Sequence, residues 1–238
     1  MIEPRNRIAF AADLALASAL ELYAKVAPQV GVAKVGLSLF VEHGPKAVDS
    51  FLKLGAKVFL DLKLHDIPNT VELAASRAGA LGVSYLTIHA SGGAEMIRAA
   101  MTGAADGAAK AGHPVPVVLA VTVLTSMNDD GLASIGVGSN AAMQVERLAL
   151  LAKASGATGL VCSAREVSDV RRTVGAGMVL CTPGIRPVGA AANDQARVET
   201  PSAAIRAGSD LLVIGRPISG AADPVEAARL IVAEISGG

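Results

Sequence analysis

Two kinds of segment alternate along the whole chain. Short runs of apolar and β-branched residues, typical of strands buried on both faces, are separated by longer stretches with the apolar spacing of amphipathic helices. The runs predict strands at residues 7–12, 32–35, 57–62, 85–88, 116–123, 159–162, 178–181 and 211–214. The stretches predict helices at residues 15–26, 39–54, 70–81, 93–111, 140–155, 165–174, 202–207 and 224–235. Several of these helices are followed by glycine, which suits a helix C-terminus.

This order makes eight consecutive units of a strand followed by a helix. Strands joined through helices lie parallel, because a parallel pair needs a long crossover connection. Eight such units in 238 residues predict an α/β fold of the (β/α)₈ TIM barrel type. No linker-like stretch interrupts the chain, so we expect a single domain over residues 1–238. The alternative is an open doubly wound sheet, although no G-x-G-x-x-G follows the first strand.

A barrel places its functional groups at the carboxyl ends of its strands. Nearly every predicted strand ends in a polar residue or glycine, so we expect these groups to converge on one rim. They are Asp13, Lys34, Asp61, Lys63, His89, Thr122, Thr125, Ser163, Pro183, Gly184, Gly215 and Arg216.

The densest group of charges follows the third strand. Asp61 and Lys63 are two residues apart, which places their side chains on the same face of a regular strand, and Asp66 follows three residues later. Two carboxylates around one ammonium are expensive to bury, and chemistry is the usual reason to do so. The plain alternative is a set of solvated loop charges beside a helix cap.

The loops after the seventh and eighth strands favour a phosphate site, as they do in many barrels. Gly215 allows a phosphate to approach its backbone N–H, and Arg216 offers a planar, permanently charged fork. Arg186 and Gln195 belong to a segment between residues 184 and 199 that has no clear period, so we expect a lid or a disordered loop there. The alternative is that Arg216 is a surface arginine before a proline.

The amino-acid composition argues against several classes of function. The formal net charge is zero, there is no tryptophan and aromatic residues make up 3%, so the chain offers neither a basic patch nor a stacking platform for nucleic acid. No apolar run spans a bilayer and no signal-peptide core is present, so we expect no membrane partner. Cys162 and Cys181 lack metal-ligand spacing and are expected to be buried free thiols in a reducing cytoplasm.

Six segments, in order, resemble the orotidine 5′-phosphate decarboxylase family over essentially the whole chain. They are AADLA, KVG, LDLKLHDIPNTV, VTVLTS, TPGIRP and VIGRPI, beginning at residues 11, 34, 60, 121, 182 and 213. The chain departs from the family's usual pattern at Leu64, where phenylalanine is common, and at Ser38, where glutamate is common. Neither departure touches a charged position of the motif.

The resemblance implies a cofactor-free enzyme that converts orotidine 5′-monophosphate into UMP and acts as a homodimer. It implies a catalytic network of Lys34, Asp61, Lys63 and Asp66, in which Lys63 donates the proton and Asp66 reaches into the partner's site. It implies these substrate-binding residues: Asp13, Lys34, Asp61, Ile67, Thr70, Thr125, Ser126, Pro183, Arg186, Gln195, Gly215 and Arg216. Of these, Asp13 would bind the ribose. The pyrimidine would be bound by Thr125, Ser126 and Pro183. The phosphate would be bound by Arg186, Gln195, Gly215 and Arg216.

Two other functions remain open. A metal-dependent sugar-phosphate decarboxylase or aldolase shares the D-x-K-x-x-D spacing and would use its carboxylates to hold Mg²⁺. The Ile-Pro-Asn-Thr sequence after Asp66 favours the pyrimidine enzyme. A non-catalytic sensor of a phosphorylated ligand would explain Gly215 and Arg216, but it gives no reason for the charges after the third strand.

Overall fold

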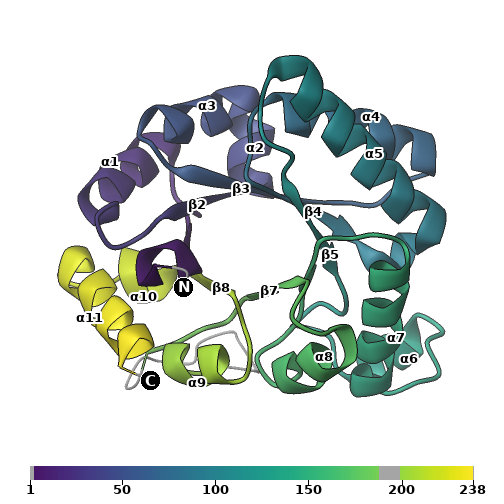
Figure 1. Cartoon of the computed structure of the whole chain (residues 1–238). Helices are drawn as coiled ribbons and strands as arrows, with labels where there is room; N and C mark the ends of the chain where they lie inside the picture. The colour runs from purple at the N-terminus through teal and green to yellow at the C-terminus, as the bar shows by residue number, and fades with distance from the viewer. Residues whose placement is uncertain (1–2, 188–198, 238) are drawn as a thin grey trace.

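Eight parallel strands form a closed barrel in the computed structural model, which describes residues 3–187 and 199–237 (Figure 1). Each strand pairs with the next in sequence and β8 pairs with β1, so the predicted (β/α)₈ fold is confirmed. The strands are β1 (Ile8–Ala11), β2 (Val32–Gly36), β3 (Lys57–Leu64), β4 (Tyr85–His89), β5 (Val117–Val121), β6 (Gly159–Val161), β7 (Val179–Thr182) and β8 (Leu211–Ile214).

Helices surround the barrel on its outside (Figure 1). The α-helices are α1 (Leu16–Val26), α2 (Leu37–His43), α3 (Pro45–Lys53), α4 (Pro68–Ala80), α5 (Gly93–Ala111), α6 (Asp129–Ser134), α7 (Ala141–Ala154), α8 (Val167–Val174), α9 (Pro201–Arg206), α10 (Arg216–Ser219) and α11 (Pro224–Ser236). The described residues also form the short 3₁₀-helices η1 (Pro4–Arg7) and η2 (Ala90–Gly92). Among the helices of the described ranges, none is long and apolar enough to cross a membrane.

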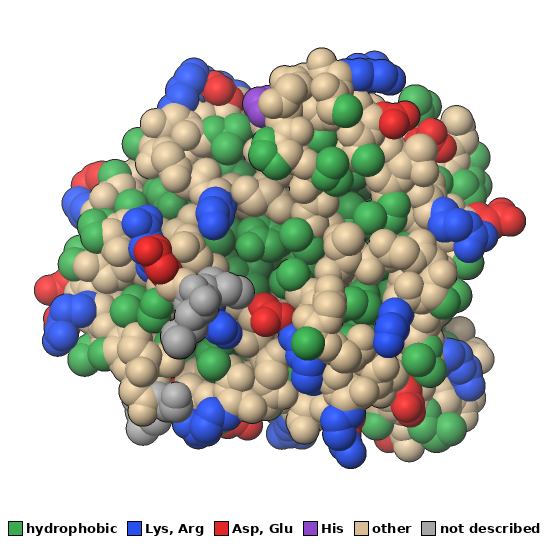
Figure 2. Space-filling model, in the orientation of Figure 1, with side chains coloured by type: hydrophobic (Ala, Val, Ile, Leu, Met, Phe, Trp, Pro, Cys, Tyr) green, Lys and Arg blue, Asp and Glu red, His purple; other side chains and the backbone are tan. Residues whose placement is uncertain are grey.

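The apolar residues form two layers. The larger cluster lies between the strands and the helices, and a smaller one fills the barrel itself, built from residues such as Phe59, Leu119 and Leu211. Viewed along the barrel axis, hydrophobic side chains fill the hollow at the centre, and most charged side chains lie around the outside (Figure 2). A buried charge inside this barrel is therefore an exception that needs explanation.

The predicted helix over residues 39–54 is wrong, because the chain forms two helices there. Gly44 separates α2 from α3 with φ of 58°, and Pro45 is the first residue of α3. Proline has no N–H to donate to the preceding turn, and it disfavours the helical conformation in the residue before it. The Gly-Pro pair is a sequence signal for this break.

The helix α6, between β5 and α7, was not predicted. It is only six residues long, and the side chain of Asn128 caps it by accepting the Gly131 N–H at 2.9 Å. Asp129, its first residue, also accepts the N–H of Ala141 at 2.8 Å and so connects the two helices. The segment is held by these polar contacts more than by an apolar face, which is why hydrophobic periodicity gave no sign of it.

Helices α4 and α5, which follow β3 and β4, pack unusually close to each other. A Cβ on Gly103 would lie 2.1 Å from the carbonyl oxygen of Glu72, and one on Gly107 would lie 1.8 Å from that of Ser76. Glycine is therefore required at both positions, because these backbones leave no space for a side chain. This contact fixes the helix that begins directly after the charged motif.

Candidate active site

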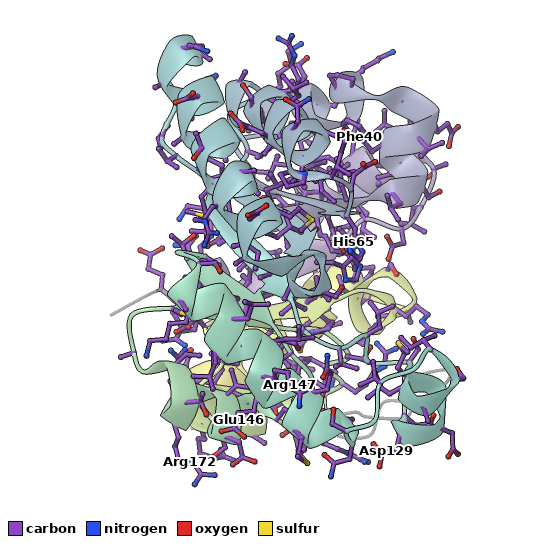
Figure 3. All side chains as sticks on the ribbon, turned by 90° about the vertical axis from the view of Figure 1, so that its right-hand side faces the viewer. Phe40, His65, Asp129, Glu146, Arg147 and Arg172 are labelled. Atoms are coloured by element: carbon purple, nitrogen blue, oxygen red, sulfur yellow. The ribbon has the colours of Figure 1, made fainter. Side chains whose placement is uncertain are left out.

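A cavity of about 480 Å³ opens among the residues that follow the strands. This volume is within the usual range for a site that encloses a small molecule. Its lining includes nine of the residues predicted for the site: Asp13, Lys34, Asp61, Lys63, Thr125, Pro183, Arg186, Gly215 and Arg216. In the side view, His65, after β3, and Asp129, in the segment after β5, lie toward the same end of the barrel, as expected for residues that follow parallel strands (Figure 3).

Charges of alternating sign run along one wall of the cavity. Lys34 Nζ lies 3.3 Å from Oδ1 of Asp13 and 3.7 Å from Oδ2 of Asp61. Lys63 Nζ donates to Oδ1 of Asp61 at 2.8 Å. The order is therefore Asp13, Lys34, Asp61, Lys63, drawn from β1, β2 and β3 and the residues that follow them. Within one chain, Asp61 lies between two ammonium groups.

Asp61 is held in its ionised form. Burial of the carboxyl raises its pKa, but Lys34, Lys63 and the hydroxyl of Thr87 together outweigh that effect, so the pKa lies below the ordinary value. The side chain of Asp61 is 12% exposed and that of Lys34 is 10% exposed. Lys63 is more open, at 31%, and is the ammonium better placed to meet a ligand.

The backbone of Lys63 has an unusual conformation. Its φ is 50°, which makes it the single non-glycine residue with positive φ in the described part of the chain. The register between β3 and β4 also shifts here, since Leu60 pairs with Leu86 and Leu64 pairs with Ile88. The sequence predicts that the two-residue repeat of a regular strand places Lys63 beside Asp61. In the structure a bulge in β3 places it there instead.

Thr87, on β4, contacts this bulge and was not among the predicted site residues. Its Oγ1 accepts the backbone N–H of Lys63 at 2.9 Å and donates to Oδ1 of Asp61 at 2.9 Å. The residue is fully buried. A single polar residue within an apolar strand was the signal in the sequence that could have drawn attention to it.

Gly36 leaves room for the Lys34–Asp13 contact. A Cβ at this position would lie 3.0 Å from Lys34 Nζ and 3.2 Å from Oδ1 of Asp13. The glycine of the KVG segment therefore keeps the space between the first two charges of the array clear.

Asp66, which the resemblance places at the partner's site, does not join the charged array of its own chain in the described structure. It is exposed, and its Oδ1 accepts the N–H of Ile67 at 2.7 Å. Asp66, Ile67, Thr70 and Ser126 are exposed and are absent from the described residues that line the cavity. Gln195 lies outside the described residues.

Three other residues expected on the rim do not line the cavity within the described ranges. Thr122 donates to the carbonyl oxygen of Val161 at 2.9 Å, and the hydroxyl of Ser163 donates to Glu166. The ring of His89 packs against that of His65 with centroids 5.4 Å apart. Burial, then the neighbouring His65 and Lys63, lowers the pKa of His89, which favours its neutral form.

The floor of the cavity is apolar and includes both cysteines. Cys162 and Cys181 are free and buried, as predicted, and they line the cavity with Phe59 and Val161. Burial raises the pKa of the Cys162 thiol to about 12 and that of Cys181 well above its ordinary value. Both thiols therefore remain protonated at neutral pH and act as small apolar groups.

Two arginines lie on the part of the cavity formed after β7 and β8. Arg186 is 7% exposed, and its backbone N–H donates to the carbonyl oxygen of Glu199 at 3.0 Å. Arg216 follows Gly215. If Gly215 carried a side chain, its Cβ would lie 3.2 Å from the Cβ of Ala11. The cavity is therefore lined by the two arginines, by the alternating charges of β1 to β3 and by the apolar floor.

The described ranges contain no group of three or more His, Cys, Asp or Glu residues arranged to hold a metal ion. Asp61 already accepts two hydrogen bonds on one oxygen and has Lys34 near the other. Its carboxylate is therefore engaged by ammonium and hydroxyl groups.

Comparison with known proteins shows the family. The model of the Orotidine 5′-phosphate decarboxylase / HUMPS family matches residues 6–231. A protein of Anaeromyxobacter dehalogenans named orotidine 5′-phosphate decarboxylase is 52% identical, covering 98% of this chain and 99% of its own. One of the same name from Paramagnetospirillum magneticum is 50% identical, covering 92% and 93%.

A solved structure agrees. The crystal structure of orotidine 5′-phosphate decarboxylase from Lactobacillus acidophilus superposes with a TM-score of 0.86 at 40% identity, covering 97% of this chain and 99% of that one. The resemblance predicted from the six sequence segments is therefore confirmed.

Proposed function

The chain belongs to the Orotidine 5′-phosphate decarboxylase / HUMPS family, and on that premise we propose that it converts orotidine 5′-monophosphate into UMP and CO₂. This reaction is the last step of de novo pyrimidine nucleotide synthesis. The observation that carries the proposal is one cavity holding the Asp13–Lys34–Asp61–Lys63 array on one wall and Arg186 and Arg216 on another. A nucleoside monophosphate has a matching arrangement, with its base and its phosphate at opposite ends.

The chemistry requires a group that stabilises a carbanion and then protonates it. The bond from C6 of the pyrimidine to the carboxylate breaks, CO₂ leaves, and the bonding electron pair stays on C6. No carbonyl group is positioned to delocalise this pair. In the proposed mechanism the Lys63 ammonium, which Asp61 holds at 2.8 Å, stabilises the developing charge and donates a proton to C6. Solvent then reprotonates Lys63.

A preformed array supports this role, because groups that are already oriented need not reorganise during the reaction. The barrier must fall by about 20 kcal/mol, which is near the upper part of the usual range for enzymes. One lysine does not supply that amount. We therefore propose that Arg186, Arg216 and the backbone at Gly215 bind the phosphate, and that this binding energy orients the base against Lys63. Gln195 is proposed to bind the phosphate as well.

The remaining residues have proposed roles toward the sugar and the base. Asp13, whose side chain is 66% exposed at the cavity, is proposed to bind the ribose hydroxyls. Thr125 and Pro183 line the cavity and are proposed to contact the pyrimidine together with Ser126. The apolar floor of Phe59 and the two protonated thiols suits an uncharged ring face.

The active unit is proposed to be a homodimer in which Asp66 completes the site of a second copy. Asp66 is exposed, and Ile67 beside it is 66% exposed. Leu37, the first residue of α2 directly after β2, is 53% exposed, which adds apolar surface at the same end of the barrel. A two-fold contact there would place each Asp66, with Ile67 and Thr70, at the partner's cavity. Each Lys63 would then lie between its own Asp61 and the second copy's Asp66.

Two further expectations belong to this proposal. The chain is proposed to act as a single domain over residues 1–238. Its place is proposed to be the cytoplasm, because Cys162 and Cys181 are free thiols and a reducing compartment keeps them so.

The metal-dependent alternative uses the same carboxylates. The contacts of Asp61 with Lys34, Lys63 and Thr87 favour the cofactor-free reaction, because a metal ion would have to displace them. The test is to add orotidine 5′-monophosphate in the presence of EDTA and follow the loss of its absorbance. We expect full activity with EDTA and no gain with Mg²⁺. Activity that EDTA removes and Mg²⁺ restores would support the alternative.

A further inference from the structure

Thr87 connects two paired charges of the cavity, Asp61 and Lys63, through one hydroxyl group. It lies in the middle of β4 and is fully buried. Its Oγ1 accepts from the backbone of Lys63 at 2.9 Å and donates to Oδ1 of Asp61 at 2.9 Å, and Lys63 Nζ donates to that same oxygen at 2.8 Å. The three groups form a closed ring of hydrogen bonds.

The hydroxyl of Thr87 accepts the backbone N–H of Lys63, in place of a backbone carbonyl of the neighbouring strand. Between the pairs Leu60–Leu86 and Leu64–Ile88, four steps along β3 match two along β4. Lys63 lies inside this bulge with φ of 50°, a conformation that residues with a Cβ adopt rarely. A backbone N–H in such a position needs a partner, and here a side chain supplies it. The unusual backbone of Lys63 is therefore held by Thr87.

We infer that Thr87 is a positioning residue for the decarboxylation, whose hydroxyl fixes the backbone of Lys63 and one oxygen of Asp61 together. Thr87 is not among the described residues that line the cavity, so it acts through these two neighbours. The inference rests on the proposed function, because a pre-oriented ammonium matters for that reaction. No metal, cofactor or additional substrate is required.

The variant Thr87→Val tests this directly, since valine has nearly the same shape and makes neither hydrogen bond. We expect kcat for orotidine 5′-monophosphate to fall about 10- to 100-fold, the effect of a displacement of order 1 Å at a reacting group. KM should change by less than about threefold, because the residues proposed to bind the phosphate are untouched. A purely structural role would lower the amount of folded enzyme and leave kcat per folded site unchanged.

A second readout does not depend on activity. The Thr87 hydroxyl stabilises the ionised form of Asp61, so its removal should raise the pKa of that carboxyl. Titration of the Asp61 carboxyl carbon by ¹³C NMR, in wild type and Thr87→Val, measures this change. An unchanged pKa would contradict the inference even if the protein had some other activity.

The chain offers a matched control in Thr158, which precedes β6 at the opposite end of the barrel. Its Oγ1 accepts the backbone N–H of Val118 at 2.9 Å, the same kind of bond that Thr87 makes with Lys63. Thr158→Val should therefore affect stability while kcat stays within about twofold of wild type. Thr87→Ser, which keeps the hydroxyl, should retain kcat within about threefold.

The outcomes distinguish a failure of the proposed function from a failure of the role inferred for Thr87. If the wild type does not decarboxylate orotidine 5′-monophosphate, the proposed function fails and the NMR titration alone decides the placement of Thr87. If the wild type is active and folded Thr87→Val keeps either the wild-type kcat or the wild-type pKa of Asp61, the inference is wrong. Should Thr87→Val not fold, Thr87→Ser decides: near-wild-type kcat supports the inference, and a loss of about tenfold or more in folded Thr87→Ser overturns it.

Discussion

The ammonium of Lys63 donates to Oδ1 of Asp61 across 2.8 Å from a backbone whose φ is 50°. The carboxylate holds the side chain of Lys63 at the cavity wall and leaves it 31% exposed. Lys34 approaches the other oxygen of Asp61 at 3.7 Å, so the carboxylate is shared between two cations. The arrangement leaves Lys63 as the more accessible cation, consistent with a proton donor.

Replacement of Lys63 by alanine should abolish turnover and leave the fold intact. Asp61 keeps Lys34 and Thr87 as partners, so its charge stays compensated after the change. We expect kcat below about 1% of wild type, with Tm within about 4 °C. The matched control is Lys57→Ala, at the exposed start of the same strand, which should keep full activity. Retention of more than a few per cent of kcat by Lys63→Ala would remove its assignment as the donor.

Replacement of Arg216 by alanine should weaken binding of the nucleotide but hardly affect the free nucleoside. A lost charge-assisted bond to phosphate costs about 1.5–3 kcal/mol, or roughly 10- to 150-fold in Kd. Titration calorimetry with UMP and with uridine measures the two effects separately. Arg172→Ala, on the outer helix α8 where the side chain is 76% exposed, is the control and should change neither Kd. Equal losses for UMP and uridine would show that Arg216 does not bind the phosphate.

The lowered pKa of Asp61 predicts how stability depends on pH. A carboxyl whose pKa is lower in the folded state stabilises the protein above the unfolded pKa, near 4, and this contribution is lost as the pH falls through the folded pKa. At pH 7, Asp61→Asn should lower the free energy of unfolding by about 3 kcal/mol, because it leaves two ammonium groups facing each other. The difference from wild type should stay constant down to about pH 5 and shrink below about pH 4.

Urea unfolding of both proteins at a series of pH values measures this difference. Asp49→Asn is the control, since Asp49 forms an exposed pair with Lys53 and its loss should cost less than about 1 kcal/mol at pH 7. A gap between wild type and Asp61→Asn that widens toward acid would mean that the pKa of Asp61 is raised in the folded state.

The fold could be predicted from the sequence because each strand and helix carries its own apolar pattern. The break at Gly44 and Pro45 is marked by a Gly-Pro pair, but the apolar spacing continues through it and on its own predicts one helix. The short helix α6 was not visible, since polar caps and not an apolar face define it.

The sequence predicts which residues line the cavity better than it predicts the contacts between them. Residues at strand ends, such as Lys34, Asp61 and Arg216, line one cavity because parallel strands all end at the same rim. The bulge at Lys63 depends on the register of β3 against β4, and the role of Thr87 depends on that bulge. Neither can be seen in a single strand taken alone. Asp66 turns outward because the chain leaves the strand before reaching it.

The proposed sharing of Asp66 between two copies predicts complementation. Lys63→Ala and Asp66→Ala should each be inactive alone. In a mixed dimer, one site would carry both defects and the other neither, so random exchange should restore about a quarter of wild-type activity. The measurement is kcat per site after mixing, with heterodimers quantified by mass spectrometry. Heterodimers that form without any gain in activity would show that Asp66 acts within its own chain.

The most direct test of the account is to carry out the reaction in D₂O with EDTA and analyse the product. The Lys63 ammonium exchanges its protons with solvent, so the proposed mechanism predicts UMP carrying one deuterium at C6, formed together with one equivalent of CO₂. Mass spectrometry and ¹H NMR of the product measure both. Failure of the wild-type protein to form UMP from orotidine 5′-monophosphate under these conditions would contradict the account.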